Sequence, residues 1–410
     1  MRRFLKVVGI LIGLVLLTGV AFGAGLFVGT NNLFTPCIVR TANEPAPFTV
    51  FWQAWNLVQK NFVDRTALDP TTLTYGAIRG MVEALGDTGH STFLTPQQKA
   101  MQASSMSGSF SGIGAEMGVR NNLPVIVAPI DGSPASKAGI KAGDILVRVN
   151  GQDVTTESLQ TIVQMVRGPA GTTVDLTILR PSDQKSYDFT ITRSEIDVPA
   201  ATWVMVPGTK LADIRISEFS ANAERDVTAA IQGAHSAGAT GFIVDVRNDP
   251  GGLLDQAIKV TSQFLKDGNV LLEEDAQGNQ TPFPVQPGGQ ATELPLVVLV
   301  NNGTASSAEI FAGAIQDHQR GQVVGETTFG TGTVLEPYTL SDGSELLLGV
   351  KQWLTPNGRL IRKQGIQPDV EVKLPLGSDL LTPDQLRDMT PDALQQSQDA
   401  QFLKALSLLK

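Results

Sequence analysis

Gly241 to Gly252 reads G-F-I-V-D-V-R-N-D-P-G-G, and Leu296 to Glu309 reads L-V-V-L-V-N-N-G-T-A-S-S-A-E. Each stretch begins with a short apolar run typical of a buried strand and ends in small and polar residues that lead into a helical pattern. Repeated strand–loop–helix units predict an α/β layer structure. Ligands bind such folds at the loops that leave the carboxyl ends of strands, so both loops are candidate functional segments.

The surrounding sequence extends this pattern from residue 196 to about residue 378. We expect further strands over 211–216 and 322–325, with helices over 223–238, 253–265 and 310–317. A short helical tail is expected over 379–410.

The two loops carry different chemistry. Gly251 and Gly252 before a helix expose backbone N–H groups that suit an anion or an oxyanion, although a plain tight turn fits as well. Ser306 follows a strand and precedes a helix, where a serine can act as a nucleophile. Ser306 and Glu309 also match a helix capping box, and spacing alone favours that structural interpretation.

Residues 107–195 change to short strands with one or two helices, which predicts a small β-rich domain. Its notable pieces are the loop Gly112-Ile113-Gly114-Ala115 and the run Ser133 to Ile145, S-P-A-S-K-A-G-I-K-A-G-D-I. In that order they resemble a PDZ domain. The glycines of the loop would let backbone N–H groups converge on a peptide carboxylate, helped by Arg167, while the adjoining strand edge pairs with the peptide. A purely structural glycine-rich hairpin is the alternative.

The N-terminal residues 1–30 predict a membrane segment. Val7 to Gly29 contains no charged residue and follows Arg2, Arg3 and Lys6. About 20 apolar residues suffice to span a bilayer, and the basic flank should remain in the cytoplasm. An uncleaved anchor is therefore favoured over a signal peptide cleaved near Ala21-Phe22-Gly23, and the rest of the chain is expected outside the cytoplasm.

Between the anchor and the β-rich domain, residues 31–48 read as a linker and residues 49–106 as a helical segment. Aromatic residues recur at helical spacing over 51–62, which favours packing in a core. Thr95-Pro96 marks a helix start.

The composition of the chain excludes several classes of function. The chain has 410 residues, a net charge of −9 and a single cysteine, Cys37. An acidic chain lacks the basic footprint of nucleic-acid binding, and one cysteine excludes a disulfide framework. Without a cluster of metal-ligand residues we expect neither a metal site nor a cofactor, which disfavours a metal-dependent hydrolase.

From about residue 50 onward the chain resembles the C-terminal processing peptidases, a family of tail-specific serine proteases. The matching segments lie in the family's order along nearly the whole chain: A-I-R-G-M-V-E-A-L-G-D (Ala77 to Asp87), F-S-G-I-G-A-E (Phe110 to Glu116), D-V-R-N-D-P-G-G (Asp245 to Gly252), T-A-S before A-E-I (Thr304 to Ile310), A-G-A-I-Q-D (Ala312 to Asp317), T-P-N-G-R (Thr355 to Arg359) and G-I-Q-P-D (Gly365 to Asp369). The resemblance implies an α/β core of the crotonase or Clp-protease kind. It also implies a serine–lysine dyad that cleaves unstructured, often C-terminal, segments of exported proteins.

Carried over to this sequence, the resemblance makes Ser306 the nucleophile and the backbone N–H groups of Gly252 and Ser307 the oxyanion donors. The family's general-base lysine falls at Thr331, and its supporting glutamine falls at Leu335. A serine nucleophile needs an adjacent base, and threonine offers only a neutral hydroxyl.

Three explanations follow for the missing lysine. A base from elsewhere acts, with Lys351, Lys363 and the less well placed His318 as candidates; or the chain is an inactive, peptide-binding pseudoprotease; or it is an inactivated copy of an enzyme. The additional change at Leu335 favours natural divergence. We therefore expect a membrane-anchored serine endopeptidase that takes polypeptides with a free C-terminus, with the pseudoprotease as the alternative.

Overall fold

The structure is a computed structural model that describes residues 48–87, 90–130, 132–375 and 378–409. The expected membrane segment 7–29 and most of the linker lie outside these ranges. Among the described helices, none combines the length and the apolar character needed to cross a bilayer.

The chain divides into two units, of which the first ends at Thr74. Its described part holds α2 (Phe48–Asn61), the 3₁₀ turn η1 (Arg65–Ala67) and the start of α3 (Pro70–Glu83). The expectation that the aromatic residues of α2 pack in a core is wrong, because α2 buries no side chain. The rings of Phe51, Trp52 and Trp55 contact one another instead.

The second unit, Tyr75–Lys410, contains the predicted α/β core. Its six-stranded sheet has the order β10-β11-β12-β15-β16-β19, and all neighbouring pairs are parallel except β10 with β11. The strands are β10 (Ala201–Met205), β11 (Leu211–Ile216), β12 (Gly241–Asp245), β15 (Leu296–Val300), β16 (Gln322–Gly325) and β19 (Val370–Glu371).

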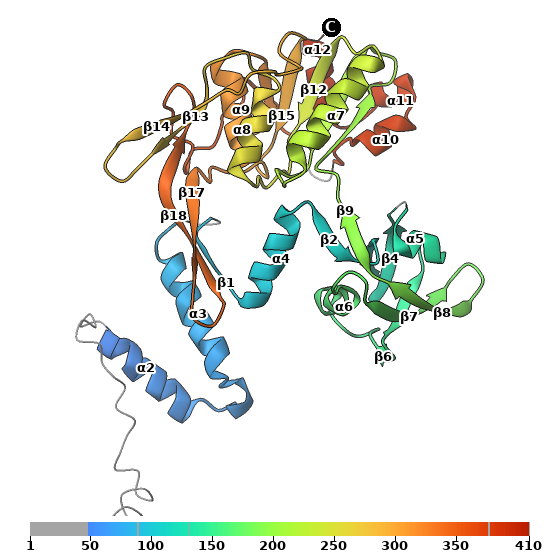
Figure 1. Cartoon of the computed structure of the whole chain (residues 1–410), viewed down its shortest axis with the longest axis vertical. Helices are drawn as coiled ribbons and strands as arrows, with labels where there is room; N and C mark the ends of the chain where they lie inside the picture. The colour runs from blue at the N-terminus through green and yellow to red at the C-terminus, as the bar shows by residue number, and fades with distance from the viewer. Residues whose placement is uncertain (1–47, 88–89, 131, 376–377, 410) are drawn as a thin grey trace, which may run out of the picture. The chain divides into compact units, whose positions relative to one another are not determined.

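Both faces of this sheet are covered, which explains why β15 is apolar throughout and β12 is apolar up to its last residue, Asp245, rather than alternating. One face packs on the larger apolar cluster and the other on a smaller cluster formed with the C-terminal helices (Figure 1). The first set comprises α7 (Ala223–Ser236), α8 (Leu254–Ser262) and α9 (Ser307–Asp317), and the second comprises α10 (Pro383–Arg387), α11 (Pro391–Gln395) and α12 (Ala400–Leu408).

A second sheet stands beside the core and includes part of the segment that the sequence predicts as helical. The expectation of helix alone over 49–106 misses β1 (Thr92–Leu94), which pairs with β18. A three-residue strand has too short a pattern to detect, whereas α4 (Pro96–Met106) begins at Thr95 with the expected cap. The sheet is completed by β13 (Asn269–Glu274), β14 (Gln280–Pro284), β17 (Thr333–Thr339) and β18 (Glu345–Leu354).

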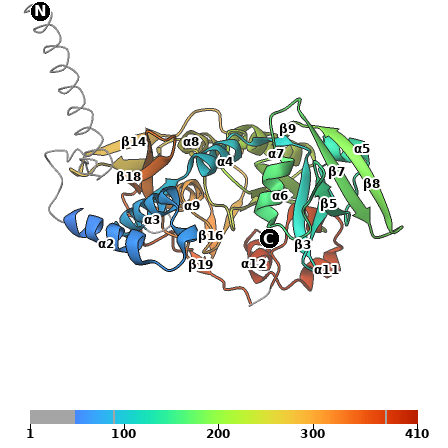
Figure 2. The same cartoon turned by 90° about the horizontal axis from the view of Figure 1, so that it is seen from below.

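The β-rich domain has its own apolar cluster and an antiparallel sheet in the order β3-β4-β5-β7-β8 (Figure 2). A short pair, β2 (Ser109–Gly112) with β9 (Ser194–Asp197), links its two ends. The sheet strands are β3 (Ala115–Arg120), β4 (Leu123–Pro129), β5 (Ile145–Val149), β6 (Gln152–Asp153), β7 (Thr173–Arg180) and β8 (Lys185–Thr192), and the helices are α5 (Pro134–Ala138) and α6 (Leu159–Val166).

Candidate active site

Ser306 lies at the N-terminus of α9, immediately beyond the loop that follows β15. Its backbone has φ +53° and ψ −119°, a conformation that is costly for a residue with a side chain. Such strain persists only where the surroundings enforce it. Here the Ser306 N–H is held by the carboxylate of Glu309 at 3.0 Å, as in one half of a capping box.

Glu309 is fully buried and collects five donors on its two carboxylate oxygens. Besides the Ser306 N–H, these are the Thr328 hydroxyl, the Gly330 N–H and both the N–H and the hydroxyl of Thr331, at 2.5–3.0 Å. Each carboxylate oxygen accepts more than one hydrogen bond, so all five contacts form together. Glu309 therefore ties the 328–331 loop to the start of α9.

Thr331, to which the resemblance assigns the position of the missing lysine, lies against Ser306. Its hydroxyl accepts the Ser306 N–H at 2.7 Å and donates to Glu309 at 2.7 Å. With its proton committed to Glu309 and no charge of its own, this hydroxyl has no capacity to take a proton from the serine. Leu335 lines the cavity that also contains Ser306.

Gly251 and Gly252 pass directly beside the serine. A Cβ on Gly251 would lie 2.7 Å from Ser306 Cβ, and one on Gly252 would lie 2.4 Å from the Phe219 carbonyl oxygen. Both have positive φ, so only glycine fits. The Ser307 hydroxyl donates to the Gly252 carbonyl at 3.0 Å, which draws the two loops together.

The Gly252 and Ser307 N–H groups are engaged by no hydrogen bond in the part of the chain that the structure describes. The bridge between Gly252 and Phe219 uses the Gly251 carbonyl and the Leu253 N–H, not the N–H of Gly252 itself. Ser307 occupies the first turn of α9, where N–H groups lack intrahelical partners. Two free donors next to a serine match the arrangement of an oxyanion site.

The side chains of Asp249 and Asn301 hold these two loops in place. The Asp249 carboxyl accepts the Gly251 N–H at 2.8 Å, while its backbone carbonyl accepts the Ala305 N–H at 2.9 Å. Burial raises the pKa of Asp249 well above its ordinary value. Asn301 donates its side-chain amide to the side chain of Asn248 at 2.8 Å, which joins the ends of β12 and β15.

A cavity of about 470 Å³ opens at Ser306. None of the three alternative bases considered from the sequence lines it. Lys351 is ion-paired with Glu273, which raises the pKa of the lysine. His318 bonds the Asn269 carbonyl at 2.7 Å, and the Lys363 side chain extends toward Gly86.

Two other side chains with basic nitrogens do line this cavity: His90 and Lys99. His90 precedes β1 by two residues, and the pairing of both β1 and β17 with β18 brings it against Thr333 of β17. The sequence signal that could have identified it is Asp87 and His90 on one loop between two helical stretches.

The predicted peptide-binding loop of the β-rich domain precedes a sheet edge. The Ile113 and Gly114 carbonyls accept the N–H groups of Ala135 and Ile130, which fixes the loop to the domain. Next to it, β3 has only β4 as a partner among the described strands, and α6 packs against β3. This is the geometry in which a peptide strand can add to a sheet.

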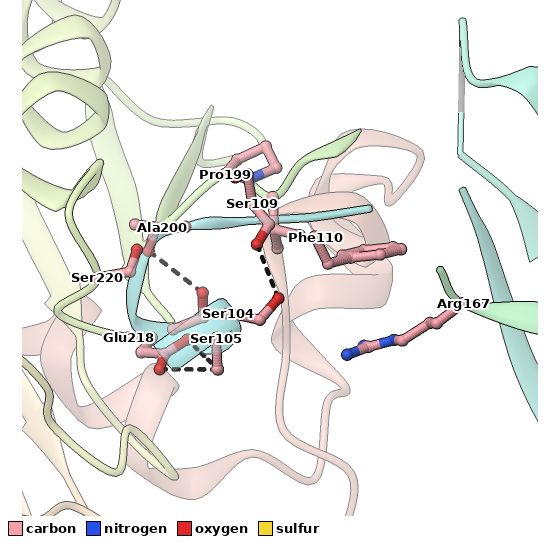
Figure 3. A pocket seen from close by; sticks show the side chains of 12 residues that line it. Ser104, Ser105, Ser109, Phe110, Arg167, Pro199, Ala200, Glu218 and Ser220 are labelled. Carbon is pink, nitrogen blue, oxygen red and sulfur yellow. Dashed lines mark hydrogen bonds between the residues drawn. The ribbon is translucent and has the colours of Figure 1, made fainter. Parts of the chain in front are cut away.

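Arg167 ends α6 and points into a separate cavity of about 200 Å³ (Figure 3). Its guanidinium lies 4.8 Å from the centre of the Phe110 ring. The opposite wall carries Glu218, which accepts the Ser105 hydroxyl at 3.2 Å and whose pKa is raised by burial. Arg167 thus lies next to the loop at Gly112, as a side chain that stacks on an aromatic ring.

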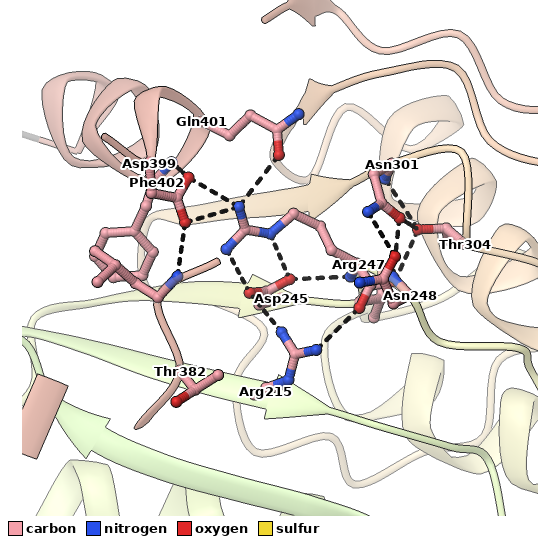
Figure 4. A network of polar contacts seen from close by, with 12 residues as sticks. Arg215, Asp245, Arg247, Asn248, Asn301, Thr304, Thr382, Asp399, Gln401 and Phe402 are labelled. Atoms are coloured by element: carbon pink, nitrogen blue, oxygen red, sulfur yellow. Dashed lines mark hydrogen bonds and ion pairs between the residues drawn. The ribbon is translucent and has the colours of Figure 1, made fainter. Parts of the chain in front are cut away.

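Behind the serine loop, an ion-pair network connects β12 to the C-terminal helices (Figure 4). Arg247 is fully buried between Asp245 at 2.7 Å and Asp399 at 2.9 Å. Arg215 donates at 3.0 Å to Oδ2 of Asp245, the oxygen that also accepts from Arg247. These contacts fix the chain between β12 and the Asp249 loop.

Comparison with known proteins identifies the class to which this fold and site belong. Residues 210–372 match peptidase family S41, and residues 125–180 match the PDZ domain. The class is therefore that of serine peptidases of family S41 that carry a PDZ domain.

The chain is 38% identical over 362 residues to a carboxyl-terminal-processing protease of Synechocystis sp., covering 87% of this chain and 81% of that protein. It is 35% identical over 376 residues to the carboxy-terminal processing protease CtpA of Bacillus subtilis, covering 92% and 78%. A solved structure of a photosystem II D1 C-terminal processing protease is 29% identical, with a TM-score of 0.45 and coverage of 80% and 94%. On the strength of the Synechocystis and Bacillus relatives, the chain belongs to the carboxyl-terminal processing protease family.

Proposed function

We propose that the chain is a serine endopeptidase that acts outside the cytoplasm on unstructured C-terminal segments of exported proteins. One observation carries this proposal: Ser306 opens into a cavity next to the backbone N–H groups of Gly252 and Ser307, which no described residue engages in a hydrogen bond. In this assignment Ser306 attacks the scissile carbonyl, and the two N–H groups stabilise the oxyanion that forms.

The PDZ domain supplies substrate recognition in this proposal. A substrate with a free C-terminus adds as a strand to the edge of β3, and its carboxylate meets the backbone N–H groups of the loop Gly112 to Ala115. Arg167 passes Gly112 of this loop with its Cγ and carries its guanidinium to the ring of Phe110. The apolar run 7–29 anchors the chain in the membrane in this assignment.

A second candidate function is that of a peptide-binding pseudoprotease. It is favoured by Thr331, whose hydroxyl occupies the place expected for the base and is already bonded to Ser306 N–H and Glu309. Loss of a general base typically slows a reaction by about 10²–10⁴-fold.

The test compares the purified full-length chain with its Ser306→Ala variant on an unstructured polypeptide that ends in apolar residues and a free carboxylate. We expect cleavage by the wild type and none by the variant. Equal inertness of the two would support the pseudoprotease instead. In that case Thr331→Lys combined with Leu335→Gln should create activity, because it restores a base beside the serine.

A further inference from the structure

His90 is the one imidazole that lines the Ser306 cavity in the described part of the chain. Lys99, which shares the cavity, is ion-paired with Glu345 at 2.6 Å and also donates to the Thr339 hydroxyl. The Lys99 ammonium is thus already engaged as a donor, and an ammonium has no acceptor capacity. His90 has no such carboxylate within direct hydrogen-bonding contact.

The hydrogen bonds around His90 determine which ring nitrogen carries the proton. Nδ1 contacts the hydroxyl of Thr333. That hydroxyl lies 3.5 Å from Oδ2 of Asp87, to which it donates. Since the single proton of Thr333 goes to a carboxylate, Thr333 accepts from Nδ1–H, and Nε2 keeps its lone pair.

Asp87 is well placed to hold the relay of hydrogen bonds that runs from His90 through Thr333 to its own carboxylate. The Ser91 hydroxyl donates to it at 2.6 Å, and Arg362 pairs with it at 3.2 Å. Burial acts to raise the pKa of Asp87, but the bonds from Ser91 and the charge of Arg362 outweigh it and leave that pKa below its ordinary value. Asp87 is thus an ionised acceptor at neutral pH.

The protonation state of His90 also suits the role of a general base. Burial lowers the pKa of His90 below its ordinary value, and the positive charge of Arg362 acts in the same direction, while Asp87 opposes them. The imidazole is therefore neutral at pH 7. Lys99 and Glu345, the other charged groups of the cavity, are paired with each other.

We propose that His90 replaces the missing lysine as the general base for Ser306, with Thr333 and Asp87 as positioning residues; the proposal rests on the peptidase function above. His90 Nε2 takes the proton of the Ser306 hydroxyl, directly or through one water, as the serine oxygen bonds to the carbonyl carbon. The imidazolium then gives this proton to the leaving amine as the C–N bond breaks. Water attacks the acyl-enzyme, its proton passes to Nε2, and the Ser306 oxygen recovers it when the acid leaves.

The test measures kcat and KM of the full-length chain on the polypeptide substrate, together with the rate at which a fluorophosphonate labels Ser306. We expect His90→Gln to lower kcat and the labelling rate by about 10²–10⁴-fold with little change in KM. Thr333→Val, which removes the relay, should lower kcat less and shift its pH profile. The matched control is His235→Gln, an exposed histidine far from the cavity in sequence, which should behave like the wild type.

A second measurement distinguishes a base from a structural residue. Because only the neutral imidazole accepts a proton and the pKa of His90 is lowered, wild-type kcat/KM should fall on the acid side of the ordinary histidine pKa of about 6.5. Installing Thr331→Lys in the His90→Gln background should restore activity and move this acid limb to higher pH, because a lysine amine must be deprotonated to act.

The outcomes separate the two proposals. If wild type cleaves, Ser306→Ala is inert and His90→Gln stays within threefold of wild type, the role of His90 is overturned and the peptidase function stands. If wild type and Ser306→Ala are equally inert, both proposals fail. Circular dichroism of His90→Gln must match the wild type; if the variant is unfolded, the wild-type acid limb and the effect of Thr333→Val decide the matter.

Discussion

At the scale of single residues, Asp213 of β11 carries a carboxyl group for which the core provides no partner. It is fully buried, and neither oxygen has a hydrogen bond among the described residues. Burial raises its pKa well above the ordinary value, and the nearby charge of Asp245 adds to the shift. The folded chain therefore holds Asp213 protonated.

This predicts a pH-dependent gain in stability for Asp213→Asn. Because the pKa of Asp213 is higher in the folded chain, its contribution to the free energy of unfolding is fully present below its pKa in the unfolded chain, near 4. That contribution is lost as the pH rises toward its pKa in the folded chain. The variant lacks this loss, so its free energy of unfolding should exceed that of wild type by an amount growing about 1.4 kcal/mol per pH unit above pH 4, up to the folded pKa. Urea unfolding at pH 4–8 measures it.

The control for this prediction is Asp384→Asn, an exposed carboxyl paired with Arg387. Its difference from wild type should stay within about 0.5 kcal/mol at every pH. A stability difference for Asp213→Asn that is flat between pH 4 and 8 would mean that Asp213 is ionised in the fold.

At the scale of elements, Asp399 joins α12 to the central sheet. It caps α12 by accepting the Phe402 N–H at 3.0 Å, accepts the Leu381 N–H at 2.9 Å and pairs with Arg247. Removing one partner of a buried ion pair leaves the other charge unpaired, which costs about 3–5 kcal/mol.

We therefore expect Asp399→Ala to lower the free energy of unfolding by about 3–5 kcal/mol, measured by chemical denaturation. Asp392→Ala, an exposed residue in the first turn of α11, serves as the matched change and should cost far less. If both substitutions cost the same, the Arg247 network adds nothing beyond an ordinary helix start.

The sheet edge at β3, beside α6 and the glycine loop, leads to a binding prediction. In the Ser306→Ala background, peptides with a free C-terminal carboxylate should bind the full-length chain about tenfold more tightly than their amides, because a charge-assisted hydrogen bond contributes about 1.5–3 kcal/mol. Fluorescence anisotropy with paired peptides measures this ratio. Equal affinities would assign the domain a spacer role.

At the scale of the whole molecule, the apolar run 7–29 predicts how the chain is distributed in a cell. The full-length chain should remain with membranes after high-salt washing, and a version lacking residues 1–30 should not. External protease should reach the folded part in cells stripped of their outer layers. An intact chain recovered from the soluble fraction would contradict the anchor, and a new N-terminus after Gly23 would indicate a cleaved signal.

The sequence by itself determined the α/β pattern and the two loops that carry the candidate site. The strands over 211–216, 296–300 and 322–325 were predicted with the bounds that the structure has. The strand over 296–300 is the clearest case, because a strand buried on both faces is apolar throughout. The tight loop at Gly251 and Gly252 could also be predicted from the local sequence, because glycine adopts positive φ more readily than other residues.

Only the tertiary structure decided which side chains meet at Ser306. Glu309 reads as a cap in the sequence, yet it holds a loop that begins at Thr328 and whose sequence contains no signal of that contact. His90 reaches the cavity because β1 and β17 both pair with β18, and the pairing of short strands distant in sequence is set by burial and register across the whole sheet. Contacts of this kind depend on how the elements pack, and a pattern along the chain does not record them.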